Sequence, residues 1–310
     1  MLRCCRTEGD LYSIPRFDVK RTDIEGFINE LRLFHEKFRG CFYRQESREK
    51  FFQYMVGQLS DLERKSIEPM ALKVEGADIR SMQKFISNTA WDEEKMLRIH
   101  HKMVADEMGD EEGVLIFDES GFAKKGDDSA GVSKQYCGNL GKVENCQVGV
   151  FAAYASRQGY CLLDKRLFVP EKWFDEDYAV RRKKCEIPED IVFKKKPQLA
   201  VQILTDLQQE NIVPFKYIVA DTIYGNSPEF INALESCTGK TYFVSIPSDT
   251  LCWLQSPKTS TRQYKYKGEI HSKQVAETKP LSVEAVAKRI HDYFWYRGTV
   301  SFGNQRTNRI

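Results

Sequence analysis

Two aspartates in this chain each follow a short run of apolar residues. Asp118 comes directly after Val114–Phe117, and Asp221 comes directly after Tyr217–Ala220. Continuous apolar runs of this length predict strands that are buried on both faces of a sheet. Open α/β sheets usually hold their functional side chains where strands end. If the two strands are neighbours, both carboxylates therefore emerge at the same edge of the sheet.

Paired carboxylates at one sheet edge could hold divalent metal ions. Mg²⁺ prefers oxygen ligands, and two such ions about 3.5–4 Å apart can activate water and stabilise the leaving oxygen of a phosphodiester. The alternative is that each aspartate only caps the turn after its strand, which is the better interpretation of a single such residue. Asp118 and Asp221 lie 103 positions apart with further sheet elements between them. This arrangement favours a metal site.

The segments between and around the two aspartates show alternating strand and helix patterns. Gly159 separates two strand-like runs, which predicts an antiparallel hairpin. Ser227-Pro228 has the usual N-cap and N1 residues of a helix. Together these elements predict a mixed α/β sheet. In chain order they are a strand over Val114–Phe117, strands over Gln147–Ala155 and Tyr160–Val169, a helix over Pro197–Glu210, a strand over Tyr217–Ala220, the helix after Ser227, and a strand over Tyr242–Ile246.

The first hundred residues carry apolar side chains at steps of three and four, which predicts amphipathic helices. Thr22, Ser47, Asp78 and Asp92 are the candidate N-caps of four such helices, and Gly109 is expected to end the last one. The last two helices could form a helix-turn-helix. Because they lack a clear basic recognition face, an ordinary helical bundle is the favoured interpretation.

The pattern weakens after Pro247. Tyr264–Lys267 alternates aromatic and basic residues, which predicts an edge strand with polar faces. Ser282 to about Tyr293 predicts one amphipathic helix. Residues 298–310 show no periodicity and do not resemble the end of a domain.

Composition indicates a globular protein, since 41% of the residues are hydrophobic and 30% are charged. No apolar run approaches the ~18 residues of a membrane span, and the N-terminus lacks the apolar stretch of a signal peptide. We therefore expect a cytoplasmic protein with no membrane partner. The nine cysteines include no C-x-x-C pair, which disfavours zinc ribbons and thioredoxin-type sites.

Charge is unevenly distributed along the chain. The net charge is +2, but residues 257–310 contain 11 Lys/Arg and 4 Asp/Glu, which gives this segment a net charge of +7. A basic segment on a mildly acidic body suggests that one face binds a polyanion. A solvated lysine-rich loop region is an equally good explanation of the charge alone.

Several sequence blocks together resemble DDE-type bacterial transposases, specifically those of the insertion-sequence 701 type. The resemblance runs from about residue 20 to residue 297. It is carried by FDESGFAKKG at residues 117–126, GVSKQYCG at 131–138, LFVPEKW at 167–173, VADTIYG at 219–225, and QKFI at 83–86 with Trp91-Asp92. Each block alone is weak, and the combination is specific.

The resemblance implies an RNase H-like core over residues 111–248. A helical region that could bind DNA would precede it at 1–110, and the start of a β-rich insertion would follow at 249–310. Asp118 and Asp221 would be the first two acids of a catalytic triad that holds Mg²⁺ or Mn²⁺, with two ions in the complete family member. Lys124, Lys125 and Gly126 would lie near DNA phosphates, and a solvated turn between strands is the alternative.

The family's partners and location follow from the same resemblance. The expected partner is double-stranded DNA, at the terminal inverted repeats of the element and at the target. The active form is expected to be a homo-oligomer in the prokaryotic cytoplasm, associated with the nucleoid.

The third acid of the family is a glutamate on a helix that follows the insertion. Glu229, Glu269, Glu277 and Glu284 are present, but none stands in that context. We therefore expect a C-terminally truncated transposase that is a poor catalyst or none, with an apolar sheet face partly uncovered. The alternatives are an inactive DNA-binding remnant, or a metal-dependent nuclease with an unrecognised third ligand.

Overall fold

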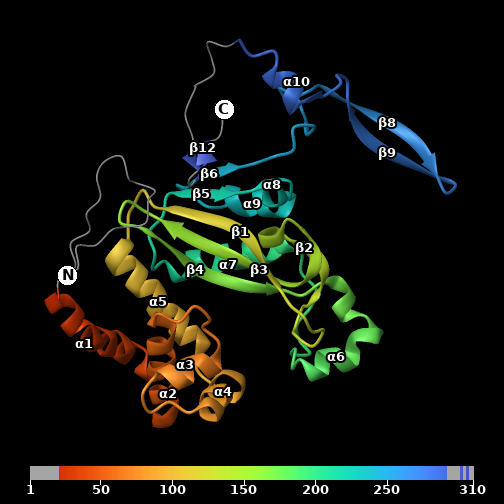
Figure 1. Ribbon diagram of the computed structural model, residues 1–310. Coiled ribbons are helices and arrows are strands. Elements are labelled where there is room, and N and C mark those ends of the chain that lie inside the picture. The colour runs from red at the N-terminus through yellow and green to blue at the C-terminus, as the bar shows by residue number, and fades with distance from the viewer. Residues whose placement is uncertain (1–20, 292–300, 303–304, 307–310) are drawn as a thin grey trace.

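The computed structural model describes residues 21–291 and the short segments 301–302 and 305–306. A helical region comes first, a six-stranded mixed sheet with helices follows, and a β-hairpin with one short helix lies beyond the sheet (Figure 1). This order confirms the predicted α/β class with helices at the N-terminal side. Among the helices of these residues, none combines the length and apolar character that crossing a membrane requires.

The helical region packs around an aromatic cluster. Phe38, Phe42 and Phe85 are buried, and Phe51 and Trp91 pack against them. These large rings fill the space where the helices meet. The elements are α1 (Arg21–Lys37), η1 (Arg39–Cys41), α2 (Gln45–Leu59), α3 (Ile67–Lys73), α4 (Ile79–Asn88) and α5 (Glu93–Met108).

The predicted helix caps are partly confirmed. The side chains of Asp78 and Asp92 accept backbone N–H groups at the starts of α4 and α5, and Gly109 follows the last residue of α5. The prediction for Ser47 was wrong, because α2 already begins at Gln45 and Ser47 is buried inside it. The proposed cap Thr22 lies inside α1, which begins at Arg21.

The sheet combines antiparallel and parallel pairs. Strand β1 is antiparallel to β3 and parallel to β5, and β5 is parallel to β6. Strands β2 and β4 both pair with β3. The spatial order is therefore β4-β3-β1-β5-β6, with β2 extending the β4 side. The strands are β1 (Val114–Ala123), β2 (Ser133–Cys137), β3 (Lys142–Ala155), β4 (Tyr160–Phe168), β5 (Tyr217–Ala220) and β6 (Thr241–Val244).

Two strand predictions need correction. The first strand does not end before Asp118; it continues to Ala123, because β3 offers backbone partners along that whole length. Its polar second half broke the apolar pattern on which the prediction rested. Strand β2 was not predicted, since its alternating residues form only a short edge hairpin with the first part of β3.

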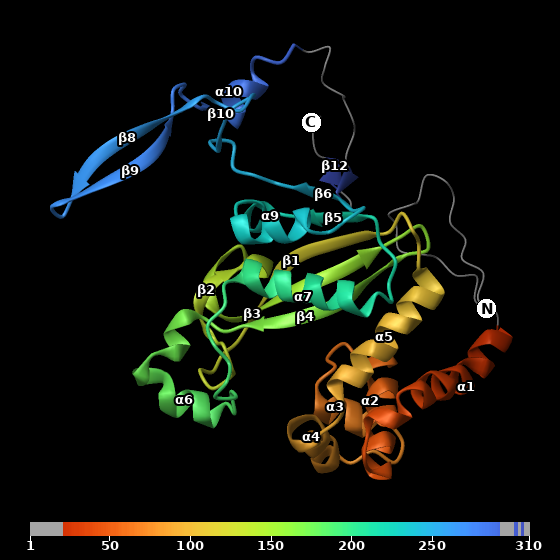
Figure 2. The same cartoon turned by 180° about the vertical axis from the view of Figure 1, so that it is seen from behind.

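Helices cover one face of the sheet. Figure 2 shows α7 (Lys196–Glu210) lying across it, and Phe230 of α9 (Pro228–Glu235) meets the ring of Phe117 at 5.6 Å. The buried core lies between these helices and the sheet. On the other face of the sheet, Phe122 is 48% exposed and Leu162 is 62% exposed. Within the described residues, that apolar face carries no covering helix.

Short helices and further strands complete the structure. They are η2 (Gly138–Leu140), η3 (Glu171–Phe174), η4 (Glu176–Tyr178), α6 (Ala179–Lys184), α8 (Thr222–Gly225), β7 (Leu251–Cys252), β8 (Thr259–Tyr266), β9 (Glu269–Ala276), β10 (Leu281–Ser282), α10 (Val283–Ala287), β11 (Ser301–Phe302) and β12 (Gln305–Arg306). The β8–β9 hairpin projects away from the sheet (Figure 1). It contains the predicted strand over Tyr264–Lys267. The predicted helix from Ser282 ends early, at Ala287, and residues 292 and 293 lie outside the described residues.

The buried hydroxyl of Tyr154 generates a prediction about stability. It accepts the backbone N–H of Asp110 at 2.9 Å and donates to the carbonyl of Pro214 at 2.9 Å, which joins the segments leading into β1 and β5. Tyr154→Phe takes this partner from two partly buried backbone groups, so we expect it to lower the free energy of unfolding by about 1–2 kcal/mol. Urea denaturation measures this. Tyr160→Phe, at a tyrosine that is 61% exposed, is the matched control, and an equal effect of both variants would contradict the prediction.

Candidate metal centre

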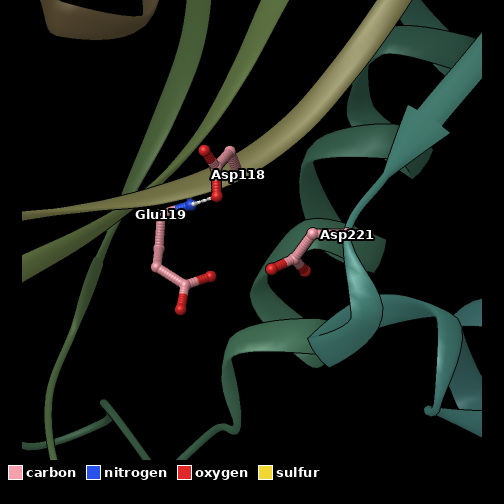
Figure 3. A group of neighbouring side chains, drawn as sticks. All are labelled: Asp118, Glu119 and Asp221. Atoms are coloured by element: carbon pink, nitrogen blue, oxygen red, sulfur yellow. Dashed lines mark hydrogen bonds between the residues drawn. The ribbon is translucent and has the colours of Figure 1, made fainter. Parts of the chain in front are cut away.

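Three carboxylates meet beside the end of β5. Asp118, Glu119 and Asp221 each offer one oxygen, and these three oxygens lie within 4.8 Å of one another. In Figure 3 the carboxylate of Asp221 points across the gap toward the other two. The structure therefore brings together the two aspartates singled out in the sequence and adds Glu119.

The register of two parallel strands places the aspartates. Phe117 of β1 is paired with Ala220 of β5, and each aspartate is the next residue in its chain. Strand β5 stops at this point, so Asp118 continues along β1 while Asp221 turns into α8. Gly225 is the last residue of α8. Only glycine fits there, because a Cβ would lie 1.9 Å from the carbonyl oxygen of Ser245.

Both aspartates use one oxygen to accept a backbone N–H. Oδ1 of Asp221 accepts from Ile223 at 3.0 Å, which caps α8. Oδ1 of Asp118 accepts from Glu119 at 2.8 Å. Asp221 therefore does cap a helix, as the alternative interpretation of the sequence held, but the cap uses only one of its two carboxylate oxygens. Within the described residues the second oxygen of each aspartate has no protein partner.

Glu119 has a different role from the two aspartates. Its Oε1 accepts from Nζ of Lys196 at 2.9 Å, and its Oε2 accepts from the hydroxyl of Tyr224 at 3.1 Å. Lys196 begins α7, and Tyr224 is a fully buried residue of α8. Glu119 therefore links β1 to the two helices that flank the acidic cluster.

The sequence analysis did not predict Glu119, Lys196 or Tyr224 as parts of this site. Neighbouring residues of a strand point to opposite faces, so the pattern gave no reason to expect Glu119 beside Asp118. The pairing of β1 with β5 ends at Phe117 and Ala220, so β5 does not continue beside Glu119. The long Glu119 side chain reaches into the gap that remains there. The one available signal was an acidic residue at a position that alternates with buried apolar ones.

The electrostatics of the cluster match a cation site. Burial raises the pKa of Asp118, and the negative charges of Glu119 and Asp221 raise it further, while the hydrogen bond from the Glu119 N–H opposes the shift. Burial, with the nearby carboxylates, also raises the pKa of Tyr224, so its hydroxyl stays protonated and keeps donating. Neighbouring carboxylates repel each other when both are ionised, and a divalent cation between them offsets this repulsion.

The donor set also fits a hard cation. Two aspartate oxygens without protein partners face one gap, and carboxylate oxygens are the usual ligands of Mg²⁺ and Mn²⁺. Both oxygens of Glu119 are already engaged, so it fits as a residue that shapes the site better than as a ligand. A divalent ion would thus be held by Asp118 and Asp221.

The predicted phosphate-binding residues lie elsewhere. Lys124, Lys125 and Gly126 form the turn after β1, roughly 20 Å along the strand from Asp118 at about 3.3 Å per residue. The side-chain amide of Asn145 donates to the carbonyls of Lys124 and Gly126 at 3.0 and 3.1 Å, which fixes the turn. The structure does not bring this turn to the acidic cluster.

The remaining glutamates of the sequence analysis also lie outside the cluster. Glu229 is on α9, where it accepts from Gln198 at 3.4 Å, and Glu284 pairs with Lys288 on α10. Glu269 and Glu277 lie in and directly after the projecting strand β9. Among the described residues, the acidic group of Asp118, Glu119 and Asp221 includes none of the four.

A cleft of about 710 Å³ opens beside the acidic cluster. Its floor is the uncovered face of the sheet, with Phe122 and Phe151 in edge-to-face contact at 6.2 Å. Asp118, Glu119 and Asp221 all line it. The cleft gives an extended ligand access to the acidic residues.

Fold and site define a class of metal-dependent endonucleases. The family model of the DDE superfamily endonucleases matches residues 37–305. The chain therefore belongs to this superfamily, whose RNase H-like fold agrees with the order β4-β3-β1-β5-β6. Members generally use divalent metal ions.

One curated relative sharpens the comparison. A protein of Microchaete diplosiphon, described as a probable transposase for insertion sequence element IS701, is 28% identical over 214 residues. The matched region is 68% of this chain and 52% of that protein, so the chain spans about half the length of the relative. The resemblance to insertion-sequence transposases expected from the sequence is confirmed.

Metal binding can be tested at each carboxylate. We expect Asp118→Asn and Asp221→Asn each to weaken Mn²⁺ binding at least about tenfold, because each removes a charged oxygen ligand. Isothermal titration calorimetry measures the affinity. Glu229→Gln is the matched control, since it neutralises an exposed acid outside the cluster and should leave binding unchanged.

The same titration should depend on pH. Protons compete with the metal for ionised carboxylates. The pKa of Asp118 is raised, so affinity should start to fall at a higher pH than for an ordinary aspartate. Affinity independent of pH, or retained by Asp118→Asn, would place the ion elsewhere.

Proposed function

We propose that this chain carries out the DNA chemistry of an insertion-sequence transposase. The observation that supports the proposal most directly is the meeting of Asp118 and Asp221 where the parallel pairing of β1 with β5 ends, inside an RNase H-like sheet. In this proposal the chain binds the terminal inverted repeats of its element. It then cleaves a strand and joins the freed 3′-OH to target DNA.

The proposed roles follow from the contacts of each residue. Asp118 and Asp221 are the catalytic acids and hold Mg²⁺ or Mn²⁺, through the oxygens that the backbone leaves unengaged. When bound, such ions lower the pKa of water and stabilise the leaving oxygen of a phosphodiester. Glu119 keeps Lys196 and Tyr224 in place and so fixes the width of the gap. The cleft beside them receives the DNA strand.

The chain is proposed to be a weak catalyst. A second ion needs further carboxylate oxygens, and Mg²⁺ tolerates incomplete octahedral geometry badly. Glu119, the third acid of the cluster, already holds two partners. This observation favours, as a second candidate, a chain that binds DNA without cleaving it.

DNA is proposed to contact the basic parts of the chain. Lys124, Lys125 and Gly126 form one candidate contact, and the segment 257–310 with its charge of +7 forms another. The proposed divisions of the chain are a helical region over residues 1–110, the RNase H-like core over 111–248, and the start of the β-rich insertion over 249–310. The proposed setting is the nucleoid of a prokaryotic cell.

Cleavage of an element-end duplex tests the function. With Mn²⁺ or Mg²⁺ we expect slow nicking at the repeat end, and we expect Asp118→Ala to abolish it because the ion loses a ligand. Gel electrophoresis of labelled strands measures the products. Robust cleavage that Asp118→Ala removes would show that the residues present suffice and would contradict the weak-catalyst proposal. Nicking that survives Asp118→Ala would contradict the proposed site.

Salt dependence tests the DNA contacts. Replacing Lys124 and Lys125 by alanine should lower the slope of log affinity against log salt by about 2, since each lysine at a phosphate accounts for roughly 0.9. Filter binding at several salt concentrations gives the slope. The matched control is the pair Lys84→Ala and Lys102→Ala, which removes exposed lysines of α4 and α5. A larger loss in the control than in the turn variant would shift the contact to the helical region.

A further inference from the structure

A second candidate site lies in the helical region, far from the acidic cluster. An apolar groove of about 630 Å³ runs between α1 and α2. Phe27, Leu33 and Phe34 of α1 and Leu59 of α2 line it, and these side chains are 51%, 64%, 39% and 58% exposed. We call these four residues and the groove between them the α1–α2 groove.

The ring contacts that hold α1 to α2 lie at and just beyond the C-terminal end of α1. His35 meets Phe52 at 5.3 Å, and Phe38, the residue after α1, meets Phe51 at 5.8 Å. Figures 1 and 2 both show α1 at the outer side of the helical region, with α4 at the opposite side. A helix with an exposed apolar face gains most of its stability from packing that face against another element.

The charges on the groove restrict what can cover it. Its lining contains one acidic and one basic residue, Glu30 and Lys37. DNA binding requires an excess of positive over negative charge. The one acidic and one basic residue of this groove cancel, so the groove has no such excess. Neither residue has an ion-pair partner within the described part of the chain.

The positions of these two charges match a second copy of the same helix. Glu30 and Lys37 are two helical turns apart, about 10 Å along α1, with Leu33 and Phe34 between them. A two-fold axis through the Leu33–Phe34 step would place Glu30 of each copy opposite Lys37 of the other. A two-fold interface repeats every contact twice, so both ion pairs form while the apolar residues of both copies are covered.

We propose that the α1–α2 groove is a homodimer interface in which two α1 helices pack antiparallel. The interface leaves the acidic cleft free, because the cleft lies on the sheet and the groove lies on the helical region. The inference does not depend on the proposed DNA chemistry.

Analytical ultracentrifugation of the full chain tests the interface. We expect a reversible monomer–dimer equilibrium in the unmodified chain. Leu33→Glu should raise the dimer dissociation constant at least about tenfold, because it buries a charge at the centre of the interface. Leu72→Glu is the matched control on α3, since Leu72 is 75% exposed and lies outside the groove. Circular dichroism checks that both variants keep their helical content.

Charge reversal tests the antiparallel geometry without touching the apolar residues. Glu30→Lys alone and Lys37→Glu alone should each weaken the dimer about tenfold, because like charges then face each other twice. A mixture of these two single variants should form a heterodimer as tight as the original, since both cross pairs become complementary. The double variant E30K/K37E should also recover the dimer.

Three results would overturn the proposal. The first is an unmodified chain that stays monomeric at every concentration, which would mean that the chain's own residues or a different partner cover the groove. The second is a dimer that Leu33→Glu leaves intact. The third is a mixture of the two charge-reversal variants that dimerises no better than either variant alone.

Discussion

The acidic cluster depends on holding three like charges in one small gap. Repulsion between carboxylates within 4.8 Å would open the gap if nothing opposed it. Glu119 opposes it by accepting from Lys196 and from Tyr224, two residues on different helices. The strand that carries Asp118 is thereby joined to the helix that Asp221 caps. The half-buried ammonium of Lys196 and the buried hydroxyl of Tyr224 thus hold Glu119 beside the aspartates before any cation arrives.

Pattern and local chemistry were enough to predict much of this site. Asp118 and Asp221 were identified because each follows four apolar residues that form adjacent strands. The caps of α4, α5 and α9 were readable for a similar reason, since a capping side chain bonds to its own neighbouring backbone. Such features depend on residues that are close in the chain.

The features that escaped prediction depend on distant partners. Strand β1 runs on past Asp118 only because β3 lies alongside it, and Glu119 joins the cluster only because β5 ends beside it. The turn at Lys124–Gly126 follows Asp118 closely in the sequence, but the extended strand β1 carries it away from the acidic cluster. Proximity in sequence misleads most along a strand, where each residue adds about 3.3 Å.

The long chain separation between β1 and β5 has a consequence for how the protein reaches its native state. Val114 pairs with Tyr217, so closing this part of the sheet also closes a loop of about a hundred residues. The entropy lost in closing a loop grows with its length, and contacts of this kind form slowly compared with local ones. The two aspartates therefore come together only through a long-range pairing that spans strands β2 to β4 and α7. A cation that needs both oxygens would bind the finished sheet and not the nascent chain, and its binding would draw the folding equilibrium toward the assembled core.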